Sequence, residues 1–252
     1  MEFITGNKIK KICHHTLDEE GYKIIKNPNE TEILKIFVKI DYAHSFFQRE
    51  QNKPYILFTH NGDLPVGDDY LKYMDDPYLI TWYGQNINTI HSKLKSIPIG
   101  IANEQWEHGN ESIILDVINS SLKKDRLIYM NFDINTNKSE RKYCVNELSK
   151  KNIHMSEKLP FKDYLTELAK SYFVISPNGN GIDCHKTWEA LYLKTIPIVT
   201  KSINIDYYKN YPILIIENWR DFNIKNITID MYNTLWNNFN LENLQIKKFI
   251  KN

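Results

Sequence analysis

The sequence lacks the cysteine pattern of a disulfide-stabilised or zinc-binding protein. Cys13, Cys144 and Cys184 are its only cysteines, they lie far apart, and no two of them form a Cys-x-x-Cys pair. A small, odd number of widely spaced cysteines is typical of a protein from a reducing compartment.

An excess of one charge and a long hydrophobic run are also missing. Thirty-two Lys and Arg residues against 31 Asp and Glu residues give a formal charge of +1. We therefore expect no nucleic-acid partner, because such partners select basic surfaces. No apolar run reaches the length of a signal peptide or a membrane-spanning helix, so we expect no transmembrane segment and a cytoplasmic location. The abundance of Asn, Ile and Lys is typical of a chain encoded by an AT-rich genome, a viral one included.

Several signatures of catalysis are absent too. There is no Gly-x-Ser-x-Gly elbow and no Gly-Lys-Ser/Thr of a P-loop, which argues against hydrolase and P-loop readings. The eight histidines are scattered along the chain, so we expect no metal site.

What the sequence does have is an alternation of apolar strands with helices. Runs at residues 33–40, 54–59, 79–83 and 96–101 have the apolar, β-rich composition of strands. Their alternation with helical segments predicts an α/β protein with parallel sheets. A chain of 252 residues is long enough for two compact lobes. We place an acceptor-side lobe at residues 1–121, a second lobe at 122–228, and helices that pack back across both lobes at 229–252.

Residues 172–200 contain the most informative pattern. An apolar strand at 172–175 is followed by a turn-rich loop at 176–181, a helix at 184–193 and a second apolar strand at 196–199. A β-loop-α-β unit of this kind places ligands near the C-terminal ends of its strands.

The loop of this unit contains Gly179, Asn180 and Gly181. Free backbone N–H groups and the positive end of the helix dipole would favour a phosphate here by ~0.3–2 kcal/mol. We expect positive φ at the two glycines and a helix N-cap at Asp183. A turn without any ligand would use the same residues.

The helix of this unit has two different faces. Trp188 is expected to pack in the core, while His185, Lys186 and Glu189 lie together on another side. Lys186 suits a diphosphate, through a bond worth roughly 1.5–3 kcal/mol, and Glu189 suits a ribose diol. The alternative is a solvated salt bridge between Lys186 and Glu189.

The segment SPNGNGIDCHKTWEALYLKTIPIV, residues 176–199, resembles the nucleotide-sugar-binding segment of exostosin-like glycosyltransferases. The usual form of that segment is close to SPxGxGxDxHRxWEALxxGxIPIV. Lys186 stands where arginine is common, and Lys194 stands where glycine is common. The resemblance implies a compact version of the GT-B fold, with two Rossmann-like lobes. It also implies transfer of a sugar from a nucleoside-diphosphate sugar to a hydroxyl of a glycan or glycoconjugate.

Three further residues are similar in place to residues of that family. The resemblance implies that Arg141 faces the same phosphates as the glycine loop, although an arginine on a helix is also an ordinary surface residue. Asn86 and Asn103, each just past a predicted strand, are candidates for the acceptor-side cleft. Metal-dependent sugar transferases use an Asp-x-Asp pair, which is absent here. We therefore expect neither a metal ion nor another cofactor beside the donor substrate.

An inverting transfer needs a base on the lobe opposite the donor. Asp63, just after the strand at 54–59, is the first candidate, and a simple turn would also explain it. His60 is the second candidate, as the base or as a partner that orients Asp63, and Glu104 is the third. A retaining mechanism would need no such base.

Two other functions remain open. One is a non-catalytic module that binds a nucleotide sugar. The other is a flavodoxin-like or Rossmann-like module that binds another phosphate ligand.

Overall fold

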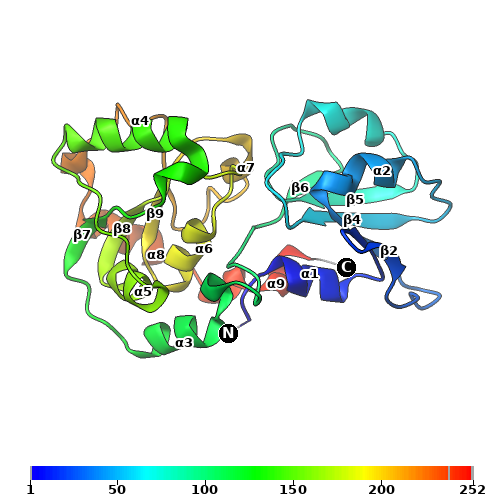
Figure 1. Cartoon of the computed structure of the whole chain (residues 1–252), viewed down its shortest axis with the longest axis horizontal. Helices are drawn as coiled ribbons and strands as arrows, with labels where there is room; N and C mark the ends of the chain where they lie inside the picture. The colour runs from blue at the N-terminus through cyan, green and yellow to red at the C-terminus, as the bar shows by residue number, and fades with distance from the viewer. Residues whose placement is uncertain (1, 238, 251–252) are drawn as a thin grey trace.

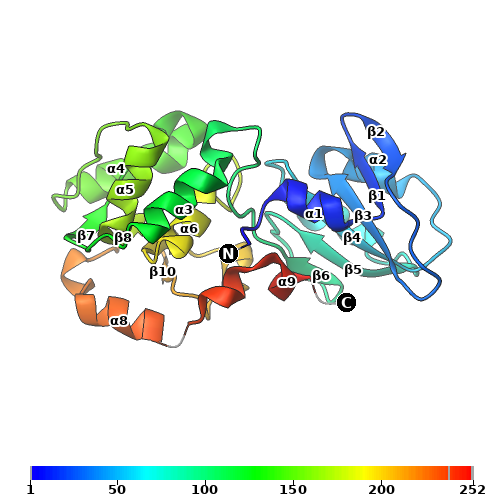
Figure 2. The ribbon, with the colours of Figure 1, turned by 90° about the horizontal axis from the view of Figure 1, so that it is seen from below.

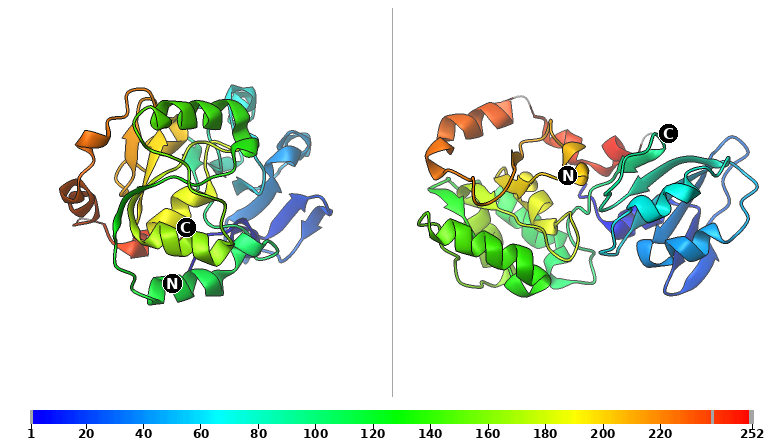
Figure 3. Two further views of the ribbon diagram at one scale, coloured as in Figure 1. Left: turned by 60° about the vertical axis from the view of Figure 1, so that its left-hand side comes forward. Right: turned by 90° about the horizontal axis from the view of Figure 1, so that it is seen from above.

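The chain forms two α/β lobes that lie side by side, each built on its own sheet (Figure 1). The computed structural model describes residues 2–237 and 239–250. One lobe has a six-stranded sheet and the other a four-stranded sheet. Seen from above, the two sheets occupy separate lobes along the long axis (Figure 3). The prediction of an α/β protein is confirmed, and the two sheets are compatible with two Rossmann-like lobes.

The first sheet is mixed, whereas a fully parallel sheet was predicted. Its strand order is β2-β1-β3-β4-β5-β6, and the edge strand β2 runs antiparallel to β1. The remaining neighbours are parallel, and every residue of the central strand β4 is buried. The strands are β1 (His15–Asp18), β2 (Gly21–Ile24), β3 (Leu34–Lys39), β4 (Tyr55–His60), β5 (Leu79–Gly84) and β6 (Leu94–Ser96).

The predicted bounds of the strand at residues 96–101 are wrong. Strand β6 covers Leu94–Ser96, and the chain then leaves the sheet. Pro98 has no N–H to donate, and Gly100 has a φ of 67°. A Cβ at Gly100 would lie 2.1 Å from the carbonyl oxygen of Ile4, so only glycine fits where these two segments cross.

Short helices cover the two faces of the first sheet. On one face, Phe46 of α2 (Ala43–Phe47) packs with Leu57 and Trp82 of the sheet. On the other face, Ile9 of α1 (Gly6–Ile12) packs with Phe58. The chain also forms six 3-10 helices in its described part: η1 (Ile40–Tyr42), η2 (Asp68–Tyr73), η3 (Glu107–Gly109), η4 (Ile134–Asn137), η5 (Ile224–Asn226) and η6 (Leu241–Leu244).

The second sheet is parallel throughout, as predicted, with the order β10-β9-β8-β7. Helices α5 and α6 share a core with one face of this sheet, and α4 and α8 share a core with the other. The strands are β7 (Arg126–Tyr129), β8 (Ser171–Ile175), β9 (Ile196–Thr200) and β10 (Leu214–Ile216). The helices are α4 (Lys138–Ser149), α5 (Phe161–Ala169), α6 (His185–Tyr192), α7 (Ile203–Asp206) and α8 (Ile229–Asn237).

Helix α3 (Glu111–Asn119) precedes residue 121 but packs in the second lobe, and the C-terminal helix α9 (Ile246–Phe249) contacts both lobes. Helix α3 buries Ile114 and Val117, three residues apart, in the core of the second lobe. In α9, Ile246 joins the core of the first lobe and Phe249 touches both cores. Figure 2 shows α9 close to α1, between the two lobes.

The buried carboxylate of Asp183 joins the lobes. Its Oδ2 accepts a hydrogen bond from the Ile99 amide of the first lobe at 2.8 Å, and its Oδ1 accepts from the Trp188 indole at 2.9 Å. The amide of Asp183 donates to Oδ1 of Asn86, again in the first lobe, at 2.7 Å. Burial raises the pKa of Asp183 to about 6, and these hydrogen bonds oppose that rise.

The predicted N-cap at Asp183 is therefore wrong, since helix α6 begins at His185 with Cys184 in the cap position. Trp188 is fully buried, which confirms its predicted place in the core. None of the described helices is long and apolar enough to cross a membrane.

Lys194, at the end of α6, adopts a left-handed conformation with a φ of 54°. The amide of Thr195 closes the helix by donating to the carbonyl of Ala190 at 2.7 Å. A side chain at this φ is strained by roughly 1–2 kcal/mol, because its Cβ approaches the following carbonyl.

We expect Lys194→Gly to raise the free energy of unfolding by about 0.5–1 kcal/mol, because glycine removes this strain but adds entropy to the unfolded chain. Lys194→Ala is the matched control, since alanine keeps the Cβ and removes the charge. Chemical denaturation measures both variants. An equal gain for alanine would mean that the charge, and not the backbone, is the source of the effect.

Candidate functional site

A cavity of about 990 Å³ opens where β7 ends, and we call it the β7 cavity. Its walls come from the loop after β7, from α4, from the approach to α5 and from α6. The lining residues used below are Phe132, Asp133, Asn135, Arg141, Lys158, Phe161, Tyr164, Lys186 and Glu189. It therefore lies at the C-terminal edge of a parallel sheet, as such ligand sites do.

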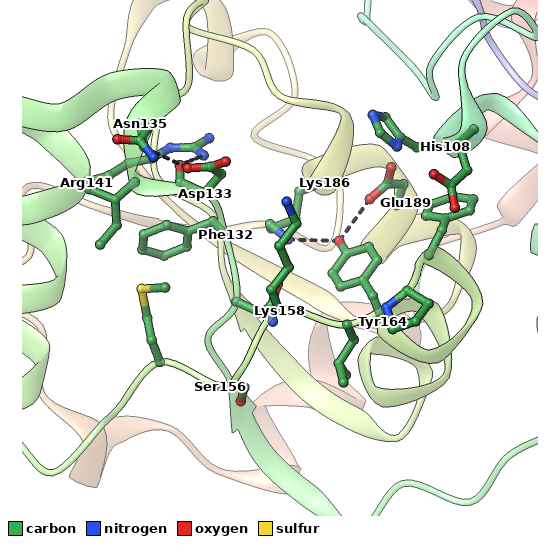
Figure 4. A pocket seen from close by; sticks show the side chains of 17 residues that line it. His108, Phe132, Asp133, Asn135, Arg141, Ser156, Lys158, Tyr164, Lys186 and Glu189 are labelled. Atoms are coloured by element: carbon green, nitrogen blue, oxygen red, sulfur yellow. Dashed lines mark hydrogen bonds between the residues drawn. The ribbon is translucent and has the colours of Figure 1, made fainter.

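Lys186 and Glu189 meet in this cavity through the hydroxyl of Tyr164. The hydroxyl accepts a hydrogen bond from Nζ of Lys186 and donates one to Oε2 of Glu189, both at 2.9 Å (Figure 4). The predicted alternative, a solvated salt bridge between Lys186 and Glu189, is not formed. Burial lowers the pKa of Lys186 to about 8, and the charge of Arg141 adds to this while that of Glu189 opposes it.

Arg141 lines the opposite side of the same cavity (Figure 4). It is 7% exposed, and its Nε and Nη1 donate to the carbonyls of Asn178 and Asp133 at 3.0 and 2.6 Å. Among the residues that the structure describes, no carboxylate forms an ion pair with Arg141 or with Lys186. The cavity wall thus holds three cations, Arg141, Lys158 and Lys186, and three carboxylates, Glu107, Asp133 and Glu189. None of these carboxylates forms an ion pair with the cations within the described residues, and unpaired cations favour an anionic ligand.

The predicted phosphate cradle at Gly179, Asn180 and Gly181 is not part of this cavity. Neither glycine has a positive φ, and the amide of Gly179 donates to the carbonyl of Gly181. The glycines serve close packing instead. A Cβ at Gly179 would lie 2.9 Å from Nη2 of Arg141, and one at Gly181 would lie 2.5 Å from Nδ2 of Asn86.

A second cavity, of about 640 Å³, lies at the C-terminal edge of the first sheet, and we call it the β4 cavity. It collects the ends of β1, β3, β4 and β5 and reaches the second lobe at one residue of α6. The lining residues used below are Asp18, Glu19, Lys39, Asp41, His60, Asn61, Asp63, Asn103, Gln105, Trp106 and His185.

Asp63 and Asn103 both line the β4 cavity, on the side where the acceptor was predicted. Asp63 is exposed, and no hydrogen bond or ion pair of its carboxylate occurs within the described residues. Asn103 accepts from the Asn7 amide at 2.8 Å and donates to Oδ1 of Asn61 at 3.0 Å. Glu104 does not line this cavity; it is exposed and pairs with Lys11.

His60 and Asn86 have structural roles. His60 is 2% exposed, its Nδ1 accepts from the Asn61 amide, and its Nε2 donates to the carbonyl of Pro98. Burial lowers the pKa of His60 to about 4. With both ring nitrogens in use and no bond to Asp63, His60 suits neither role predicted for it. Asn86 is fully buried and ties the lobes together, so it does not line the cleft.

His185 turns away from Lys186 and Glu189, with which it was grouped. Its ring lines the β4 cavity, and its Nδ1 donates to the carbonyl of Gly100 at 2.8 Å. In the neutral ring this bond leaves Nε2 unprotonated, and within the described residues Nε2 has no partner. His185 therefore offers a proton acceptor to the β4 cavity.

Several lining residues were not predicted as site residues. One of them is Tyr164, whose hydroxyl links Lys186 to Glu189. Phe132 and Asn135 follow the end of β7, where parallel sheets present ligand contacts, so their position was the available signal. No group of three or more His, Cys, Asp or Glu side chains in the described ranges could hold a metal ion.

We expect the affinity of the β7 cavity for UDP or GDP to fall as the pH rises above about 8. Lys186 is protonated below its pKa and loses its charge above it. The loss should be about 25-fold between pH 7.5 and 9.5, because the charged fraction of a group with a pKa of about 8 falls from about 0.76 to about 0.03 over this range. Calorimetric titration over this range measures it. Lys186→Arg keeps its charge and should give a flat profile; an equal decline in that variant would assign the titration to another group.

No model of a known protein family matches the chain, and no curated protein is significantly similar to it. The resemblance to exostosin-like glycosyltransferases therefore stays a prediction.

Proposed function

We propose that this chain is a glycosyltransferase of the GT-B type, which moves a sugar from a nucleoside-diphosphate sugar to a hydroxyl of a glycan or glycoconjugate. The observation that supports it best is the pair of cations, Lys186 and Arg141, that share the β7 cavity without a carboxylate partner. A diphosphate supplies the missing negative charge. The resemblance of residues 176–199 supports the same ligand class.

In this proposal the donor lies in the β7 cavity. Lys186 and the unused N–H capacity of Arg141 bind the diphosphate, and Glu189 accepts hydrogen bonds from the ribose hydroxyls. Tyr164 fixes the Lys186 and Glu189 side chains relative to each other. Phe132 and Phe161 supply the apolar wall that a nucleobase needs.

The acceptor lies in the β4 cavity, which borders the β7 cavity at the first turn of α6. Its hydroxyl oxygen forms a bond to the anomeric carbon of the donor sugar while the bond from that carbon to the diphosphate oxygen breaks. The diphosphate leaves with the electron pair, and Lys186 and Arg141 neutralise its charge. An inverting transfer passes the hydroxyl proton to Asp63, or to Nε2 of His185 as the second candidate.

Nucleotide binding followed by turnover tests this function against the two binding modules. UDP or GDP at 100 times its dissociation constant should add about 2.7 kcal/mol to the free energy of unfolding. Inorganic phosphate at the same concentration as the nucleotide should add less. Lys186→Ala and Glu189→Ala should each weaken the binding by about 1.5–3 kcal/mol, and Lys142→Ala, an exposed position on α4, should not. The matching nucleotide sugar should then be turned over, in excess EDTA as well. Binding without turnover would identify a non-catalytic module.

We expect Asp63→Asn to lower kcat at least 100-fold and to leave nucleotide affinity unchanged, since general-base catalysis is worth about 10²–10⁴ in rate. Asp69→Asn, which lies outside the β4 cavity, is the matched control. Normal turnover by Asp63→Asn together with loss in His185→Gln would move the base to His185. Normal turnover by both would favour a retaining mechanism.

A further inference from the structure

The rim of the β4 cavity carries an exposed indole. All five tryptophans lie in the described part of the chain, and only Trp106 is exposed, with 60% of its surface accessible. Trp82, Trp188 and Trp219 are fully buried. Leaving so much apolar surface in water loses roughly 25 cal/mol per Å² relative to burial, so an exposed tryptophan beside a cavity indicates a contact surface.

The backbone holds Trp106 in a fixed position. Its amide donates to the carbonyl of Asn103 at 3.0 Å, and its carbonyl accepts from the amide of Gly109 at 2.9 Å. A Cβ at Gly109 would lie 2.0 Å from the carbonyl oxygen of Asn103, so this turn closes only with glycine. The backbone that carries the indole is thus held in a tight turn before any ligand arrives, which reduces the entropy lost on binding.

Polar groups with unused hydrogen-bonding capacity line the cavity beside this ring. The Asp63 carboxylate has no partner among the described residues. Gln105 accepts from the Asn7 side chain at 3.0 Å through Oε1, and its own NH₂ group is unused. An unused acceptor and unused donors in the same cavity match a vicinal pair of hydroxyl groups, each of which both donates and accepts.

The charge of the β4 cavity excludes anions. Four carboxylates line it, and the only ammonium group in its wall, that of Lys39, is already paired with Glu19 and lies 3.8 Å from Asp41. Asp18 is paired with Lys10, and Asp63 is left without a cation. A phosphate, sulfate or carboxylate in this cavity would meet like charge in addition to losing its hydration.

We propose that the β4 cavity binds an uncharged sugar residue, with one C–H face of the pyranose ring stacked on Trp106 and its hydroxyls bonded to Asp63 and Gln105. A pyranose ring presents polarised C–H groups on its face, which suit the negative face of an indole. The name acceptor for this sugar rests on the proposed function. The binding of a neutral sugar in the β4 cavity does not rest on it. The two cavities thus divide the ligands by charge, an anion at β7 and a neutral sugar at β4.

Saturation-transfer NMR on the full chain tests this without nucleotide present. The probes are the methyl glycosides of glucose, galactose, mannose and N-acetylglucosamine, with methyl glucuronide as the anionic match to the first. We expect saturation transfer to at least one neutral glycoside, and at least tenfold weaker binding of methyl glucuronide. Trp106→Ala should reduce the binding at least tenfold without changing the melting temperature or UDP and GDP binding, and Trp106→Phe should keep part of it.

Each possible result decides the matter. No transfer to any neutral glycoside, unchanged binding in Trp106→Ala, or equal binding of the glucuronide would overturn the inference. If nucleotides still bind and are turned over in that case, the proposed function survives alone. If the neutral glycosides bind through Trp106 but no nucleotide stabilises the protein, the sugar site stands and the glycosyltransferase proposal fails.

Discussion

One buried carboxylate fixes how the two lobes meet. Asp183 accepts hydrogen bonds from the Ile99 amide in the first lobe and from the Trp188 indole in the second, while its own amide donates to Asn86. Burial alone would favour the neutral acid, and its pKa of about 6 reflects the balance between burial and these donors. Because every contact comes from a donor, the ionised form suits the site, and the start of α6 is held against residues 97–101.

Side chains from both lobes hold the loop before α6. Arg141 binds the carbonyl of Asn178 from one side, and Asn86 approaches Gly181 from the other. A methyl group at Gly179 or Gly181 would force Arg141 or Asn86 to shift. The same sequence pattern that suggests a phosphate cradle is thus explained here by packing, and the charges of the β7 cavity, not the loop amides, support an anionic ligand.

The sequence predicted the helices and strands that have a local pattern. It missed the side-chain contacts that form only when distant segments pack together. Strands β4, β5, β8 and β9 were found because each is a short apolar run between turn residues, and Trp188 because of its place on a helix. The strand at 96–101 was misplaced because Pro98 and Gly100 interrupt an apolar run. No periodicity could show that His60 is sealed by Pro98 or that Tyr164 joins Lys186 to Glu189, since these contacts form only when distant elements pack.

The first turn of α6 borders both cavities. His185 and Lys186 are consecutive residues, yet one faces the β4 cavity and the other the β7 cavity. A ligand that displaces this turn from one side displaces it on the other as well. Ligands that moved this turn would be thermodynamically linked, and the factor by which either changed the affinity of the other would be the same in both directions. In a transfer reaction such linkage leads to a preferred order of substrate binding, set by whichever ligand first fixes this turn.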